Sequence, residues 1–191
     1  MKKHLIGAAL ALGAACSAHA ADGGAPFKFV LGAGLTFGGD TLANVQYTDG
    51  STDSIKAGGL LALYGGGEFR VGDAVSVQAT IGYHVDDTKA ASNGSVKFSR
   101  YPVDLLAYYH LSDKFRLGGG AQFVNSPKLK GSGVASNIDI SFDSTTGAIV
   151  EGEYLFTPKM GLKLRAVSEK FKANGISSNG NHIGVMFNFY L

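Results

Sequence analysis

The hydrophobic and polar positions at the end of the chain, residues 181–191, alternate without interruption. One face carries Ile183, Val185, Phe187, Phe189 and Leu191. The other face carries His182, Gly184, Met186, Asn188 and Tyr190. A period of two is that of a β-strand. Because a strand at the end of a chain leaves a free edge, we expect it to pair with the first strand and to close the sheet into a barrel.

Seven earlier segments alternate in the same way. They are residues 27–37, a segment that ends at Val71, and residues 75–85, 100–111, 115–125, 137–156 and 160–171. Short turns follow the second, fourth and sixth segments, whereas long loops follow the others, including residues 126–136. All long loops therefore fall at one end, an asymmetry that is typical of transmembrane barrels. The pattern predicts an all-β, eight-stranded antiparallel up-and-down barrel.

The distribution of charge indicates which face points outward. A soluble barrel would turn its apolar face inward, and a membrane barrel would turn it toward lipid. Between the strand ends, the apolar face carries no Asp, Glu, Lys or Arg. The opposite face carries Lys28, Glu68, Arg70, Arg100, Asp104, Arg116, Glu151, Glu153, Lys163, Arg165 and Glu169. We therefore expect a transmembrane β-barrel, with the core of a soluble sandwich as the alternative.

The inward charges predict what fills the lumen. A barrel of about eight strands is just wide enough for side chains to fill it, so we expect the near-neutral inward set to form a network of ion pairs that plugs the lumen. The alternative is a narrow channel, if the inward glycines leave a continuous gap. These glycines are Gly32, Gly34, Gly66, Gly118, Gly120 and Gly184.

Aromatic residues mark two levels on the apolar face. Those near the short turns are Phe27, Phe69, Tyr109, Phe115, Tyr154, Phe156 and Phe189, and those near the long loops are Phe37, Tyr83, Tyr101 and Phe123. The interval from Tyr101 to Tyr109 spans roughly 20 Å at the usual rise and tilt of barrel strands. This length is close to the apolar band of roughly 25 Å in outer-membrane barrels, whose edges carry aromatic girdles.

The N-terminus predicts a cleaved secretory signal over residues 1–20, which leaves one barrel domain over residues 21–191. A short basic start precedes a small apolar stretch, and Ala18-His19-Ala20 fits a cleavage site. The stretch is too short to span a membrane, which takes about 20 residues. A lipoprotein signal ending at Cys16 is the alternative, although Gly13 stands where a Leu-like residue is usual. Cleavage removes Lys2, Lys3 and the only cysteine, so no disulfide is expected.

Charge narrows the range of partners. The whole chain has 17 Lys plus Arg and 15 Asp plus Glu, so loss of Lys2 and Lys3 makes the mature chain neutral. Neutrality argues against nucleic acid, because such partners select a basic excess.

The chain resembles the small outer-membrane barrel families of Gram-negative bacteria, the group that includes the OmpA transmembrane domain, OmpX and OmpW. The resemblance covers essentially all of the mature chain and rests on its strand pattern, not on a specific motif. It implies a monomer in the outer membrane with both termini in the periplasm. It also implies insertion by the barrel-assembly machinery, which recognises the final strand. Phe187 and Phe189 match that signal, and Leu191 stands where an aromatic residue is usual.

The sequence offers little that predicts catalysis, and we expect neither an enzyme nor a cofactor. His84, His110 and His182 face inward, and none has a serine beside it in the arrangement that we would expect for lipid A deacylases. Buried, hydrogen-bonded histidines are the simpler interpretation. Glu151 and Glu153 could form an acid/base pair, but they are more simply partners of Lys163 and Arg165. Neither Asp86-Asp87 nor Asp139 with Asp143 has a defined cation-ligand spacing.

One surface feature suggests a function. Lysines gather near the long loops of the later strands, namely Lys97, Lys128, Lys130, Lys170 and Lys172. Our hypothesis is that they contact the phosphates of lipopolysaccharide, and the alternative is a set of ordinary solvated lysines. We expect a non-enzymatic barrel that is structural or contacts surfaces and lipid. A narrow channel or carrier for small solutes is the alternative function.

Overall fold

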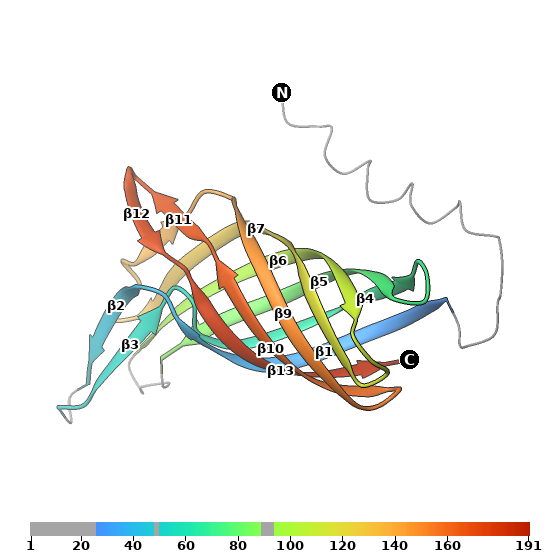
Figure 1. Ribbon diagram of the computed structural model, residues 1–191. Coiled ribbons are helices and arrows are strands. Elements are labelled where there is room, and N and C mark those ends of the chain that lie inside the picture. The colour runs from blue at the N-terminus through green and yellow to red at the C-terminus, as the bar shows by residue number, and fades with distance from the viewer. Residues whose placement is uncertain (1–25, 48–49, 89–93) are drawn as a thin grey trace.

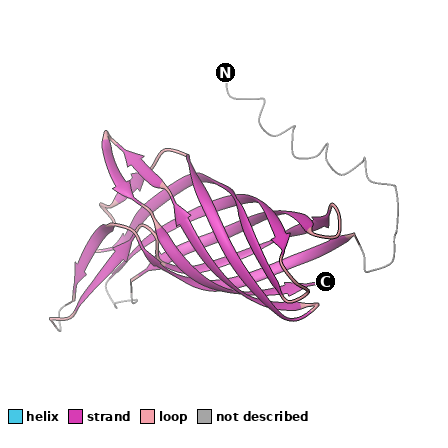
Figure 2. Ribbon diagram, viewed as in Figure 1, coloured by secondary structure: helices cyan, strands magenta, loops and turns pink. Residues whose placement is uncertain are grey.

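The computed structural model describes residues 26–47, 50–88 and 94–191. In this part the chain forms one closed sheet and two short hairpins (Figures 1 and 2). The signal segment expected over residues 1–20 lies outside the described residues. No helix in the described ranges is long and apolar enough to cross a membrane.

Eight antiparallel strands make up the barrel wall. They are β1 (Phe27–Gly38), β4 (Leu60–Arg70), β5 (Val75–Asp87), β6 (Gly94–His110), β7 (Phe115–Gly133), β9 (Thr145–Thr157), β10 (Met160–Ser168) and β13 (His182–Tyr190). Their order is β6-β5-β4-β1-β13-β10-β9-β7, and β7 pairs with β6 to complete the circle. The predicted eight-stranded antiparallel barrel is confirmed.

The last strand pairs with the first, as the alternation predicted. The β13–β1 ladder runs from Tyr190 opposite Val30 to His182 opposite Gly38. Beyond it, Leu191 and Phe29 exchange two backbone hydrogen bonds of 2.9 Å each. The edge that the end of the chain would otherwise leave open is therefore covered.

The shorter strands all lie at one end of the barrel. They are the hairpin of β2 (Thr41–Gln46) and β3 (Thr52–Lys56), the hairpin of β11 (Lys170–Ala173) and β12 (Ile176–Asn179), and β8 (Asp139–Ser141), which pairs with β7. Both hairpins project from this end in Figure 1, and the C-terminus lies at the other. We call the first the long-loop end and the second the turn end.

The outer face of the wall is apolar and the inner face is buried. Phe29 and Leu164 on the outside are each 62% exposed, whereas Glu153 and Lys163 on the inside are fully buried. A contiguous apolar band of this extent would be unstable against water. The outward direction of the charge-free face therefore agrees with a barrel that is surrounded by lipid.

The prediction of a loop over residues 126–136 was wrong, because β7 continues through most of it. Ser126 adopts a positive φ of 48°, and the ladder with β6 shifts register nearby, between Ser99 and Tyr101. After this irregularity the alternation resumes with opposite parity, so that Leu129 points inward and Lys128 lies on the outer side. The wall thus extends past the membrane band on β6 and β7.

Two other predicted strands were too long. The segment 137–156 divides into β8 and β9. Between them Phe142, which the alternation of a single strand would turn toward lipid, packs against Phe98 with ring centroids 5.5 Å apart. The segment 160–171 ends as a barrel strand at Ser168, and Phe171 in β11 is fully buried. Period-two alternation alone did not distinguish side chains that face lipid from side chains that pack under the hairpins.

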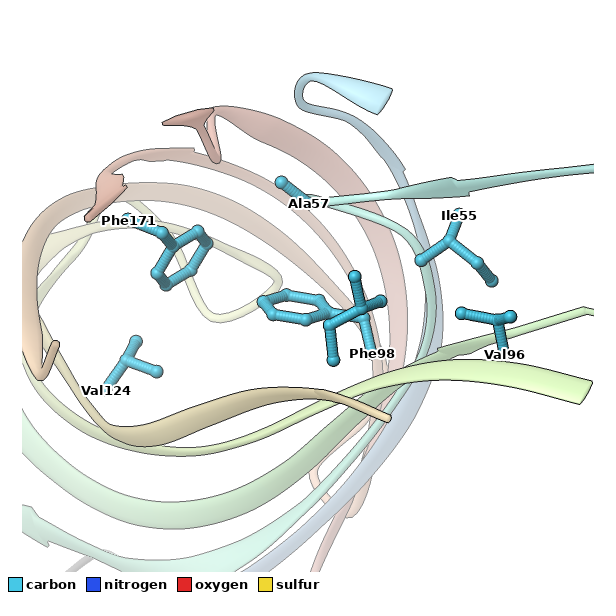
Figure 3. Packing of buried hydrophobic residues seen from close by; sticks show 7 residues of the cluster. Ile55, Ala57, Val96, Phe98, Val124 and Phe171 are labelled. Atoms are coloured by element: carbon cyan, nitrogen blue, oxygen red, sulfur yellow. The ribbon is translucent and has the colours of Figure 1, made fainter. Parts of the chain in front are cut away.

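A cluster of buried apolar side chains lies at the long-loop end of the barrel. Its members are Ile55, Ala57, Val96, Phe98, Val124, Leu129 and Phe171, which we call the loop-end cluster. In Figure 3 the rings of Phe98 and Phe171 point toward the middle of the space that the strands surround. Ile55 and Ala57 come from the β2–β3 hairpin and its connection to β4, so this hairpin is anchored to the barrel by burial of apolar surface.

Candidate functional site

The inward charges form layers along the lumen, and the layer nearest the turn end centres on Arg116. Its Nη1 donates to both carboxylate oxygens of Glu68 at 2.8 Å. Its Nε and Nη2 atoms lie 2.9 and 2.8 Å from Glu153 Oε2. Tyr190 Oη and Asn188 Nδ2 also donate to Glu153, at 2.6 and 2.8 Å. Two buried carboxylates thus share one buried guanidinium.

The middle layer centres on Glu151. Its carboxylate accepts from Lys163 Nζ at 2.9 Å and from Arg165 Nε at 2.5 Å. The Tyr108 hydroxyl donates to Glu151 as well, and Lys163 Nζ lies 2.7 Å from that hydroxyl. Arg165 reaches across to Asp104 at 2.9 Å. Glu151 therefore has the partners on the adjacent strand that a structural role requires.

The layer nearest the long-loop end centres on Arg100, which is fully buried. Its Nη1 donates to the backbone carbonyl of Ala57. Its Nη2 lies 2.6 Å from His84 Nδ1, which must accept because a guanidinium only donates. The guanidinium also lies 5.3 Å from the centroid of the Phe171 ring. Arg100 thus connects the polar lumen to the loop-end cluster above it.

Glu169 lies just beyond the last residue of β10, beside this layer. Its carboxylate is 3.6 Å from Arg100 Nη2 and 3.5 Å from His182 Nδ1. It forms no hydrogen bond with the described residues. Burial raises the pKa of this carboxyl to about 7, because desolvation outweighs the attraction of Arg100.

Two members of the expected lumen set lie outside these layers. Lys28 is half-buried at the turn-end mouth, and it makes no side-chain hydrogen bond or ion pair with the described residues. Arg70 is exposed, and its guanidinium donates to the backbone carbonyls of Gly72, at 3.2 Å, and Asp73. Both line a cavity of about 260 Å³ that opens at the turn end.

Tyrosine rings occupy the space beside two inward glycines. A Cβ placed on Gly32 would collide with the ring of Tyr64, and one placed on Gly118 would collide with Tyr108. At Gly66 and Gly120 the added atom would instead meet the backbone carbonyl of the neighbouring strand. These glycines let tall side chains and adjacent strands approach closely.

One serine lies beside an inward histidine. Ser76 Oγ is 2.9 Å from His110 Nε2. The two residues come from adjacent strands and are far apart in the sequence, so no local spacing indicated the pair. Ser76 is fully buried and lies 3.5 Å from Arg116 Nη1. The Ser76 hydroxyl is therefore not an exposed nucleophile.

Two of the acidic residues considered for cation binding have other partners. Asp86 accepts a backbone hydrogen bond from Lys56 at 2.7 Å, and Asp139 forms an ion pair with Lys128 at 3.0 Å. In the described ranges, no group of three or more His, Cys, Asp or Glu side chains is placed to hold a metal ion.

The five candidate lysines lie at the long-loop end, in two places. Lys97 on β6 is opposite Lys130 on β7, and Lys128 lies on the same outer side of the wall. Lys170 and Lys172 are exposed on β11. Lys128 is the one among them that forms an ion pair with a described residue. The structure thus places three of them on the outer side of the extended wall and two on the β11–β12 hairpin.

The residues expected to guide assembly face outward on β13. The rings of Phe187 and Phe189 pack edge to face, with centroids 5.0 Å apart. Leu191 follows the strand and is 67% exposed. The three side chains share the lipid-facing side near the turn end.

Comparisons with known proteins agree with this architecture. Residues 8–189 match the family described as "Outer membrane protein beta-barrel domain". No curated protein matched the chain significantly.

Several solved structures are similar in fold. Ail, the attachment invasion locus protein of Yersinia pestis, is 14% identical, with a TM-score of 0.49 over 85% of this chain and 97% of its own. Neisserial surface protein A is 13% identical, with a TM-score of 0.49 over 88% and 99%. OprG from Pseudomonas aeruginosa is 13% identical, with a TM-score of 0.48 over 87% and 96%.

Proposed function

The chain belongs to the outer-membrane β-barrel family of Gram-negative bacteria, and from this premise we propose that it is a non-enzymatic barrel with a closed lumen. In this proposal the functional surface of the barrel is its long-loop end, which contacts the lipid of the outer leaflet. The observation that carries the proposal is the pairing of inward charges around Arg116 and Glu151, beneath the loop-end cluster. Buried charges that satisfy one another leave few polar groups free to line an aqueous path.

The proposal includes an orientation and a route of assembly. Residues 1–20 are removed as a signal, and residues 21–191 insert as a monomer with both termini in the periplasm. The barrel-assembly machinery recognises Phe187, Phe189 and Leu191. The support for this orientation is the asymmetry of the connections, because outer-membrane barrels keep short turns on the periplasmic side.

The lysines of the extended wall are proposed to contact the phosphates of lipopolysaccharide. Lys97, Lys128 and Lys130 lie on the outer side of β6 and β7, beyond the aromatic residues Tyr101 and Phe123. Charges at this level meet the headgroups of the leaflet, and each one contributes about 1 kcal/mol of attraction to an anionic surface.

Co-purification of lipopolysaccharide tests this contact. We expect the combined variant Lys128→Ala, Lys130→Ala and Lys172→Ala to retain less lipopolysaccharide than the wild type. The control is Lys114→Ala with Lys159→Ala, which removes exposed lysines at the turn end and should leave retention unchanged. Equal retention by all three proteins would contradict the contact.

A narrow channel for small solutes is the second candidate function. The observation that favours it is the turn-end cavity, which is lined by Lys28 and Arg70 and reaches Arg116. Liposome swelling separates the two functions. If the barrel is closed, liposomes that contain the protein swell in small sugars and amino acids at the same rate as protein-free liposomes. If it is a channel or carrier, they swell faster.

A further inference from the structure

A pocket of about 600 Å³ lies on the outer side of the wall where the β9–β10 ladder ends. The last pair of that ladder is Ser168 opposite Ala148. Beyond it, the chain enters β11, which pairs with β12 and not with β9 in the described part of the sheet. The two sides of the opening meet again where the Asp143 backbone N–H donates to the Lys172 carbonyl at 2.8 Å. The pocket is therefore framed by a break in the hydrogen-bond ladder.

The lining is rich in polar groups without partners. It includes the hydroxyls of Ser144, Thr145, Thr146 and Ser168 and the side chains of Lys170 and Lys172. None of these side chains makes a hydrogen bond or ion pair with the described residues. The lining also includes Asp143 and Glu169, and the Glu169 carboxylate lies 3.6 Å from Arg100 Nη2. The pocket thus presents hydroxyl groups and two ammonium groups.

The level of the pocket identifies its surroundings. Thr146 is directly opposite Phe123 across the β7–β9 ladder, and Phe123 belongs to the aromatic residues at the long-loop end of the outer face. Aromatic belts lie at the level of lipid headgroups. The pocket therefore opens sideways toward headgroups, with its lysines on the side away from the apolar band.

We propose that this pocket binds the phosphorylated sugar headgroup of an outer-leaflet glycolipid. The inference deepens the proposed lipid contact and rests on the orientation given above. Lys170 and Lys172 bind the phosphate, and the hydroxyls of Thr146 and Ser168 exchange hydrogen bonds with those of the sugar. A phospholipid headgroup has the phosphate but lacks the ring of hydroxyls that this lining matches.

Native mass spectrometry of the refolded mature barrel in detergent tests the inference. The probes are rough lipopolysaccharide, the same lipid after phosphatase treatment, phosphatidylglycerol and free glucosamine phosphate. We expect the wild type to bind lipopolysaccharide most tightly and glucosamine phosphate to compete for it. Thr146→Val and Ser168→Ala should each weaken binding about two- to tenfold through loss of a hydrogen bond, and Lys170→Ala about fivefold. Binding of phosphatidylglycerol should change little in the two hydroxyl variants.

Matched controls separate this pocket from the lysines of β7. Thr146→Val keeps the shape of an exposed strand residue, and Ser168→Ala supplies an independent variant; heat-modifiable gel mobility checks that both fold. If Lys128→Ala with Lys130→Ala weakens binding while both hydroxyl variants bind as the wild type does, the pocket is overturned and the lipid contact stands. If the wild type prefers phosphatidylglycerol or binds no lipid, both are overturned. Binding of free glucosamine phosphate without lipopolysaccharide also overturns the glycolipid as the occupant.

Discussion

At the scale of single residues, Arg116 is the side chain on which the turn-end layer depends. It is the shared partner of Glu68 and Glu153. Arg116→Ala would leave both carboxylates buried without their counter-charge, so we expect the barrel to lose about 3 to 5 kcal/mol of unfolding free energy. Urea unfolding in detergent, followed by gel mobility, measures the loss. Arg70→Ala is the control, because that guanidinium is exposed and contacts carbonyls of a turn; equal losses in the two variants would contradict the role of Arg116.

Glu169 gives a prediction about pH. Its folded-state pKa of about 7 lies above the ordinary value of 4.5, so the folded protein binds this proton more tightly than the unfolded chain does. The protonated Glu169 carboxyl therefore contributes its full stability to the folded protein below pH 4.5. This contribution is lost as the pH rises to about 7, and it stays lost at higher pH. We expect Glu169→Gln to remove this loss, which is on the order of 3 kcal/mol. Urea midpoints of both proteins at pH 4.5 and pH 8 test it, and the same pH dependence in both would show the assignment to be wrong.

At the scale of elements, the loop-end cluster holds the hairpins against the barrel. Phe98 contacts both Phe142 and Phe171, with ring centroids 5.5 Å apart in each pair. Because the cluster lies beyond the membrane band, we expect Phe98→Ala to loosen the hairpins while the barrel stays folded. Proteinase K should then cut the β2–β3 and β11–β12 hairpins faster and spare the barrel strands. The lipid-facing variant Phe29→Ala is the control, and equal cleavage rates in all three proteins would contradict the anchoring.

The strands inside the membrane band were predicted from the sequence. The continuation of β7 beyond the band was not. Inside the band, every second side chain faces lipid and is apolar, as on β13 from Ile183 to Phe189. Beyond the band, water replaces lipid, and Lys128 and Lys130 occupy outward positions of β7. Pro127 and the glycines nearby then favoured a loop. The inward Leu129 between the two lysines was the signal for a continued strand.

At the scale of the whole molecule, the sequence predicted the topology, the closure and the direction of the faces, because each follows from alternation and charge. It also predicted that Glu151 pairs with Lys163 and Arg165, which is confirmed, but it did not predict the partners of Arg116. Arg116 pairs with Glu153 on the neighbouring strand and with Glu68, which lies on a strand that is not its neighbour. The pocket beside Lys170 was also missed, since it depends on where a ladder stops. Both features come from the three-dimensional register of the closed sheet and have no local spacing in the sequence.

Under the proposed function, side chains close this barrel along its length. Planar-bilayer recording of the refolded mature protein tests it most directly, since Tyr64, Tyr108 and the ion pairs around Glu151 would all have to move for ions to pass. We predict insertion without discrete conductance steps at neutral pH. Steady, reproducible single-channel currents from a folded, heat-modifiable preparation would contradict the account.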